Sequence, residues 1–102
     1  MAILITAASF SLAYKLEQSL NESEVYFAEH IEMPSIPGKK FIRIPEASSP
    51  IFTSELLKIC IDNQIVKIYP LKEAEIKELS KAKQLFIEYG INIIIPSNEW
   101  IL

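Results

Sequence analysis

The residues Ala2-Ile3-Leu4-Ile5-Thr6, at the start of the chain, decide the fold. Four of these five residues are apolar and no polar residue alternates with them, which is typical of a strand that is buried on both faces. Small residues follow at Ala7-Ala8-Ser9, and apolar residues then recur at helical spacing as far as Leu20. The stretch therefore predicts a central strand that leads through a tight turn into a helix.

The rest of the chain alternates between short apolar segments and longer helical repeats. Further strands are expected over residues 24–30, 41–44, 65–69 and 91–95, and each of the last three stops at a proline. Helices are expected from Ser9 or Ser11 to Asn21, over 51–63 and over 72–89. Caps are expected at Ser9 or Ser11 for the first helix, at Thr53 or Ser54 for the second and at Gly90 for the end of the third.

This alternation predicts the fold class. Strands that alternate with helices indicate a parallel sheet, and right-handed crossovers favour the strand order 3-2-1-4-5. We therefore expect an α/β, Rossmann-like, three-layer domain with a five-stranded parallel sheet over residues 1–97. The first helix would lie on one face and the other two helices on the opposite face. The first face would then lack a cover near strands four and five.

Residues 98–102 are expected to begin this missing cover. Trp100, Ile101 and Leu102 are apolar and look like the start of a truncated helix, or of a linker to an absent domain. An apolar surface left open at this place would favour a homodimer.

The composition of the 102 residues bounds the class of protein. Half of the residues are hydrophobic and 23% are charged, as in a globular domain with one modest core. The net charge of −3, without a basic stripe, gives no reason to expect a nucleic-acid partner. No segment resembles a signal peptide or a membrane span, so we expect a cytoplasmic protein without a membrane partner. The single cysteine, Cys60, is expected to be an inert, reduced core thiol.

Several catalytic and binding motifs are absent. The turn over residues 6–11 contains no glycine, so it does not match the dinucleotide fingerprint, although its place before a helix suits either an anion or a plain capped turn. Asp62 is the only aspartate and His30 the only histidine. A phospho-receiver site, a metal site and a Ser/His/Asp arrangement are therefore not expected.

Three charged residues leave alternatives open. Glu73 and Glu75 fall in the first turn of the third helix, at the carboxyl edge of the sheet where open α/β folds bind ligands. A carboxylate there either complements the helix dipole or orients a substrate amine. Arg43 either pairs with Glu24 or Glu29 or faces an anion.

The chain resembles the N-terminal, pre-ATP-grasp lobe of carbamoyl-phosphate-synthase-like ATP-grasp ligases. Its opening, Ile3 to Ala8, is similar to the ILVTGAG-type start of that family, and residues 41–45 look like the family's third strand. Further matches, in order and spacing, are Pro50, Phe52, Leu56, Leu57, Ile59, Cys60, Val66, Pro70, Glu75, Ile76, Leu79, Ser80, Leu85, Phe86, Gly90 and Ile91. The chain departs from the pattern at Ala7 and Ala8-Ser9, which replace glycines, and at Glu29-His30, where an aspartate is common.

The resemblance implies a substrate-binding lobe. The family activates a carboxylate as an acyl phosphate, which a nucleophile then attacks. ATP and magnesium are held by later lobes, so this chain needs no cofactor of its own and would have those lobes, on the same or a partner chain, as its partner. The substrate-binding residues implied here are Thr6, Ala7, Ala8, Ser9, Phe10 and Ser11 at the first turn, and Pro70, Leu71, Lys72 and Glu73 after the fourth strand.

Two functions are thus expected from the sequence. The first is a non-catalytic, substrate-orienting lobe of an ATP-dependent carboxylate–amine ligase, present as a fragment or a split subunit. The second is a stand-alone Rossmann-like binding or regulatory module without catalysis.

Overall fold

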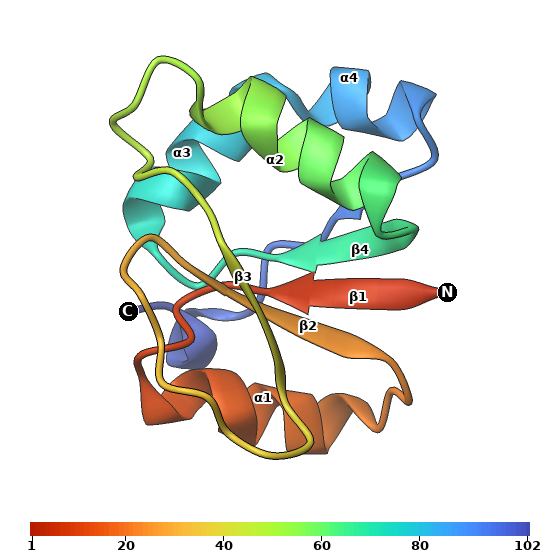
Figure 1. Cartoon of the computed structure of the whole chain (residues 1–102). Helices are drawn as coiled ribbons and strands as arrows, with labels where there is room; N and C mark the ends of the chain where they lie inside the picture. The colour runs from red at the N-terminus through yellow and green to blue at the C-terminus, as the bar shows by residue number, and fades with distance from the viewer.

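The computed structural model describes all 102 residues, and its strands alternate with helices along most of the chain (Figure 1). The elements are β1 (Ala2–Ile5), α1 (Ser11–Leu20), β2 (Val25–Glu29), β3 (Lys40–Arg43), α2 (Phe52–Asp62), β4 (Ile65–Tyr69), α3 (Glu73–Lys81), α4 (Lys83–Glu88), β5 (Asn92–Ile93) and the 3₁₀ helix η1 (Asn98–Trp100).

The five strands form one parallel sheet in the order β3-β2-β1-β4-β5. The first strand is central, and its Leu4 pairs with Tyr26 of β2 on one side and with Ile68 of β4 on the other. The fold class and strand order predicted from the sequence are confirmed. The reason is that β1 lies between two strands and under helices on both faces, which only a continuous apolar segment tolerates.

The sheet separates two apolar cores, and alternate residues of β1 belong to each. Ala2 and Leu4 pack in the core beneath α2, α3 and α4, whereas Ile3 and Ile5 pack in the core that α1 covers. Figure 1 shows these two helical layers on opposite sides of the strands. In the larger core, Cys60 is fully buried, and burial raises the pKa of its thiol to about 12. The burial of Cys60 in the core is as expected, and a raised pKa lowers the fraction of the nucleophilic thiolate.

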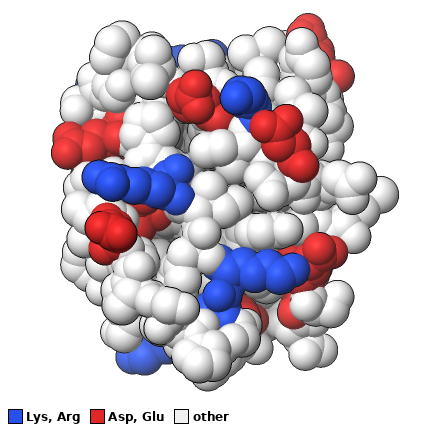
Figure 2. Space-filling view, viewed as in Figure 1, with Lys and Arg blue, Asp and Glu red and all other residues white.

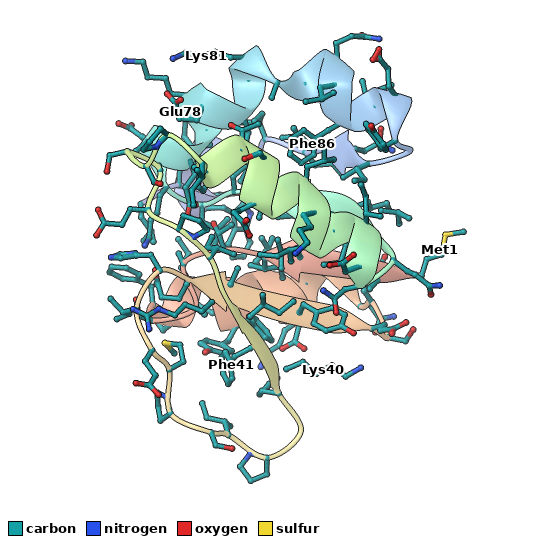
Figure 3. All side chains as sticks on the ribbon, turned by 45° about the horizontal axis from the view of Figure 1, so that its top comes forward. Met1, Lys40, Phe41, Glu78, Lys81 and Phe86 are labelled. Atoms are coloured by element: carbon teal, nitrogen blue, oxygen red, sulfur yellow. The ribbon has the colours of Figure 1, made fainter.

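The prediction of one long helix over residues 72–89 is wrong in one respect, because the structure divides this segment into α3 and α4. At Ala82 the backbone leaves the helical region, with φ −105° and ψ 8°, and its N–H donates to the Leu79 carbonyl three residues back. This tight turn is compatible with both flanking apolar anchors, since Leu79 and Phe86 are each fully buried. Figure 3 shows Phe86 pointing from α4 toward the sheet.

The predicted serine and threonine caps are also wrong. Phe10 and Ile51 occupy the N-cap positions of α1 and α2, and neither helix receives a hydrogen bond from an N-cap side chain. Ser9 uses its hydroxyl elsewhere, as described below, and Ser54 donates to the Ile51 carbonyl. The glycine stop is confirmed, because Gly90 follows α4 with φ +75°, a conformation that a residue with a Cβ rarely adopts.

The strand β5 is shorter than expected, and the chain beyond it returns to the face that α1 covers. Trp100 and Ile94 pack against the core on that face, and the Leu102 N–H donates to the Leu71 carbonyl at 2.7 Å. Residues 98–102 therefore form a partial cover of this face. The homodimer expected from an uncovered face stays a prediction.

Candidate functional site

The two segments expected to bind substrate meet at one point of the sheet. The chain leaves β1 toward α1 on one face and leaves β4 toward α3 on the other, so the crevice between these neighbouring strands opens at their carboxyl ends. The Leu71 N–H donates to Thr6 Oγ1 across this crevice at 2.8 Å, and Lys72 Nζ lies 6.0 Å from the centre of the Phe10 ring. Residues 6–11 and 70–73 thus form a continuous surface at the switch point.

Only part of this surface is accessible. The expected residues that are buried, and so support the turn, are Thr6, Ala7, Ala8, Pro70 and Leu71. Ser9, Phe10, Ser11 and Glu73 are exposed, and Lys72 is half-buried. A ligand at this edge would therefore meet Ser9, Phe10 and Lys72 first.

A buried carboxylate that is not among the expected residues organises the site. Glu29, at the carboxyl end of β2, is 2% exposed. Its Oε2 accepts hydrogen bonds from the Ser9 hydroxyl at 2.6 Å and from the Ser9 backbone N–H at 3.2 Å. Lys72 Nζ donates to its Oε1 at 2.6 Å, and the His30 N–H donates to the same oxygen at 3.0 Å. Burial alone would raise the pKa of Glu29, but the hydrogen bonds from Lys72, Ser9 and His30 outweigh it and lower the pKa to about 2.

Glu29 decides what the first turn can bind. The Ser9 N–H precedes α1, at the place where a phosphate would be held in a nucleotide-binding turn. Here the carboxylate of Glu29 occupies that donor, together with the Ser9 hydroxyl. The Ser9 donors of the turn therefore already bind an anionic group of the chain itself.

The first turn also holds an unusual backbone conformation. Ala7 has φ +59°, in the left-handed region that glycine adopts without strain. Two hydrogen bonds fix the turn, from the Tyr14 hydroxyl to the Ala8 carbonyl at 2.7 Å and from the Ala8 N–H to the Ala28 carbonyl at 3.1 Å. The first turn therefore holds an alanine in a conformation that glycine adopts more readily.

A small polar hollow lies beside this network. It has a volume of about 260 Å³ and lies between the end of β2, the loop after β3 and the first turn of α3. Its lining residues, called the hollow below, are His30, Glu46, Ala47, Ser48, Lys72, Ala74 and Glu75. Five of its seven lining residues carry polar side chains.

Glu73 and Glu75, both in the first turn of α3, differ in burial. Glu73 is exposed, whereas Glu75 is 5% exposed and its Oε1 has no hydrogen-bond partner. Burial raises the pKa of Glu75, although the Thr6 hydroxyl and the Lys72 charge oppose the rise. Glu73 is thus the solvent-facing carboxylate in the first turn of α3, where a negative charge complements the helix dipole.

Arg43 does not pair with Glu24 or with Glu29. Its Nε donates to the His30 carbonyl at 3.1 Å, and Glu24 instead lies 3.9 Å from Lys40. Glu29 is out of reach because its oxygens point inward, toward Ser9 and Lys72. Arg43 therefore bonds to the backbone just after β2 and does not pair with a carboxylate.

The charged side chains and the helices bear on three further kinds of feature: a basic surface, a metal cluster and a membrane span. On the face shown in Figure 2, basic and acidic side chains are interspersed, with no continuous basic surface. No group of three or more His, Cys, Asp or Glu side chains is placed to hold a metal ion. None of the helices combines the length and the apolar character that crossing a bilayer requires.

No known protein-family model matches the chain, and no curated protein matches it at a significant level. The functional assignment therefore depends on the geometry of the site.

Proposed function

We propose that this chain is a non-catalytic lobe that orients a small polar substrate for an ATP-dependent carboxylate–amine ligase of the ATP-grasp type. The observation that carries the proposal is the meeting of the first turn and the β4–α3 turn around the ion pair of buried Glu29 with half-buried Lys72, beside a hollow of about 260 Å³. Open α/β sheets bind ligands at this switch point. The left-handed Ala7, at a family glycine position, also supports the proposal.

The residues of this chain would bind and orient the substrate. Glu29 holds Lys72 and Ser9 in place, so both side chains are fixed before a substrate arrives. Because the same carboxylate fills the anion-binding position of the turn, ATP and magnesium would be held by other lobes. Those lobes would supply the phosphoryl transfer that activates the carboxylate substrate.

Two measurements on the chain test this proposal. We expect no release of phosphate from ATP by the pure chain. We also expect n-butyrate or n-butylamine, added at millimolar concentration to ¹⁵N-labelled protein, to shift the amide signals of residues 6–11 and 71–73. Phosphate release by the pure chain would contradict the proposal, and so would shifts confined to the apolar groove of about 410 Å³ beside Leu57 and Leu85.

One observation favours the alternative of a stand-alone binding module. The two Ser9 donors of the first turn are already satisfied within the chain, since both bond to Glu29. A module that had lost its catalytic partners would tolerate a carboxylate of its own chain at Ser9 in place of a bound anion. The two alternatives differ in the genome, because a lobe requires ATP-grasp lobes encoded in the same reading frame or in a neighbouring gene.

A further inference from the structure

A groove of about 410 Å³ runs along the outer side of α2, next to α4, on the face of the sheet opposite α1 (Figure 1). Its lining residues, called the helical groove below, are Pro50, Thr53, Ser54, Leu57, Lys58, Ile61, Asp62 and Leu85. Ile61 is 48% exposed and Leu85 is 42% exposed, so the groove presents apolar side chains to solvent. Apolar surface of this kind, bordered by polar residues, is typical of a place where another molecule docks.

The helical groove contains two charged residues of opposite sign. Lys58 and Asp62 lie one turn apart on α2, both are exposed, and neither forms an ion pair within the chain. Asp62 is also the last residue of α2, where the helix dipole disfavours a negative charge, and no basic residue lies in that last turn. A cation supplied from outside the chain would therefore stabilise this end of the helix.

This arrangement of charges fits a second copy of the same chain. A two-fold symmetric contact places the same surface of two copies face to face, so that surface must complement itself. When two copies of α2 pack antiparallel about a point between Lys58 and Asp62, the lysine of each copy faces the aspartate of the other. The apolar residues Leu57, Ile61 and Leu85 of both copies would then be enclosed between the two helices. A partner with a strong net charge has no such match, because the two charges of the groove cancel.

We propose that the helical groove is the contact surface of a homodimer, in which α2 packs antiparallel against α2 of a second copy and Lys58 pairs with Asp62 across the two-fold axis. This surface differs from the partly covered face beneath α1, on which the sequence placed a homodimer contact. The proposal does not depend on the proposed function, because the helical groove shares no residue with the first turn, the β4–α3 turn or the hollow. A dimer of this kind leaves the carboxyl ends of β1 and β4 open.

Sedimentation equilibrium with charge-reversed variants tests the proposal. At high micromolar concentration, the 11.6 kDa wild-type chain should sediment with twice that mass. Lys58→Asp and Asp62→Lys each place like charges opposite one another twice in the dimer, so each variant alone should dimerise at least about tenfold more weakly. Mixed in equal amounts, the two variants should associate with each other, because one carries only acids at these two positions and the other only bases. The double variant Lys58→Asp/Asp62→Lys should dimerise as the wild type does.

Two controls separate the contact from net charge and from folding. Lys77→Asp makes the same change of charge on the exposed surface of α3, outside the helical groove, and should dimerise as the wild type does. Asp62→Lys should keep the fold, because a cation suits the carboxyl end of α2, so its loss of dimer would not arise from unfolding. Far-ultraviolet circular dichroism and urea denaturation of each variant check this.

Three outcomes would overturn the proposal. A wild-type chain that stays monomeric at high micromolar concentration would leave the helical groove to a different partner. A dimer that persists in both single variants would mean that the copies meet through another face, such as the one beneath α1. Variants that are weakened alone but do not associate on mixing would mean that Lys58 and Asp62 do not face each other.

Discussion

At the scale of single residues, Glu29 joins three segments that are distant in the sequence. It bonds Ser9 of the first turn, His30 of its own strand end and Lys72 after β4. Its lowered pKa makes this network sensitive to acid. The pKa of Glu29 is about 2 in the folded state, whereas its ordinary value is 4.5. The ionised carboxylate therefore stabilises the fold fully at pH values above 4.5.

Replacing Glu29 by glutamine should remove this dependence on pH. In the wild type, the contribution of Glu29 is present above pH 4.5 and is lost as the pH falls toward about 2. We expect Glu29→Gln to lose about 3 kcal/mol of unfolding free energy near neutral pH and much less in acid, as measured by urea denaturation at a series of pH values. The solvent-exposed Glu22→Gln is the control. A loss that is the same at every pH would contradict the assigned role.

Two left-handed residues give a paired prediction with opposite signs. Gln64 is exposed with φ +56°, and Gly90 has φ +75° with open space where a Cβ would lie. We expect Gln64→Gly to stabilise the fold by about 0.5–1 kcal/mol and Gly90→Ala to destabilise it by about 1 kcal/mol, because only backbone strain changes. Urea denaturation measures both changes. Gln64→Ala serves as the control and should leave stability near that of the wild type.

At the scale of secondary-structure elements, the apolar pattern of the sequence predicts where strands and helices lie. It does not predict helix breaks and caps, which depend on competition between nearby hydrogen-bonding groups. The strand over residues 65–69 is predicted to the residue, since β-branched residues precede a proline there. The break at Ala82 leaves no signal in the sequence because the apolar repeat continues through it from Leu79 to Phe86. The cap expected at Ser9 does not form because a distant carboxylate, Glu29, competes for its hydroxyl.

The short helix α4 depends on one anchor. Phe86 is fully buried, whereas the neighbouring Ile87 is 45% exposed. We expect Phe86→Ala to lose about 3–5 kcal/mol of unfolding free energy, since it leaves a cavity between α4 and the sheet. Ile87→Ala should lose less than about 1 kcal/mol. Comparable losses in the two variants would mean that α4 does not dock through Phe86, and thermal or urea denaturation would reveal this.

At the scale of the whole molecule, strand order could be predicted but the site could be predicted only in part. The parallel order 3-2-1-4-5 places residues 6–11 next to 70–73, as the sequence implied. The same order also brings the ends of β2 and β3 to this edge, so Glu29, His30 and Glu46 could have been found by following every strand to its carboxyl end. Which of Glu73 and Glu75 is buried depends on the rotation of α3, which the sequence leaves open.

The single tryptophan, Trp100, lies in the segment that partly covers the core beneath α1. Trp100 packs against that core together with Ile94, so it is part of the same cooperative unit as the sheet. We expect its fluorescence to shift to longer wavelength in the same urea transition that far-ultraviolet circular dichroism detects. A fluorescence change at clearly lower urea concentration would mean that residues 98–102 detach before the sheet unfolds.

The two ends of the chain lie at opposite ends of the strands, with Met1 at the amino end of β1 and Leu102 near the carboxyl ends (Figure 1). Met1 is 90% exposed, and Leu102 is bonded to Leu71, next to the turn that carries Lys72. A fluorophore or fused protein attached after Leu102 would stand at the same end of the strands as the turn that carries Lys72, whereas the same group placed before Met1 would stand at the other end. Attachment chemistry should therefore be chosen by which of these two positions an experiment requires.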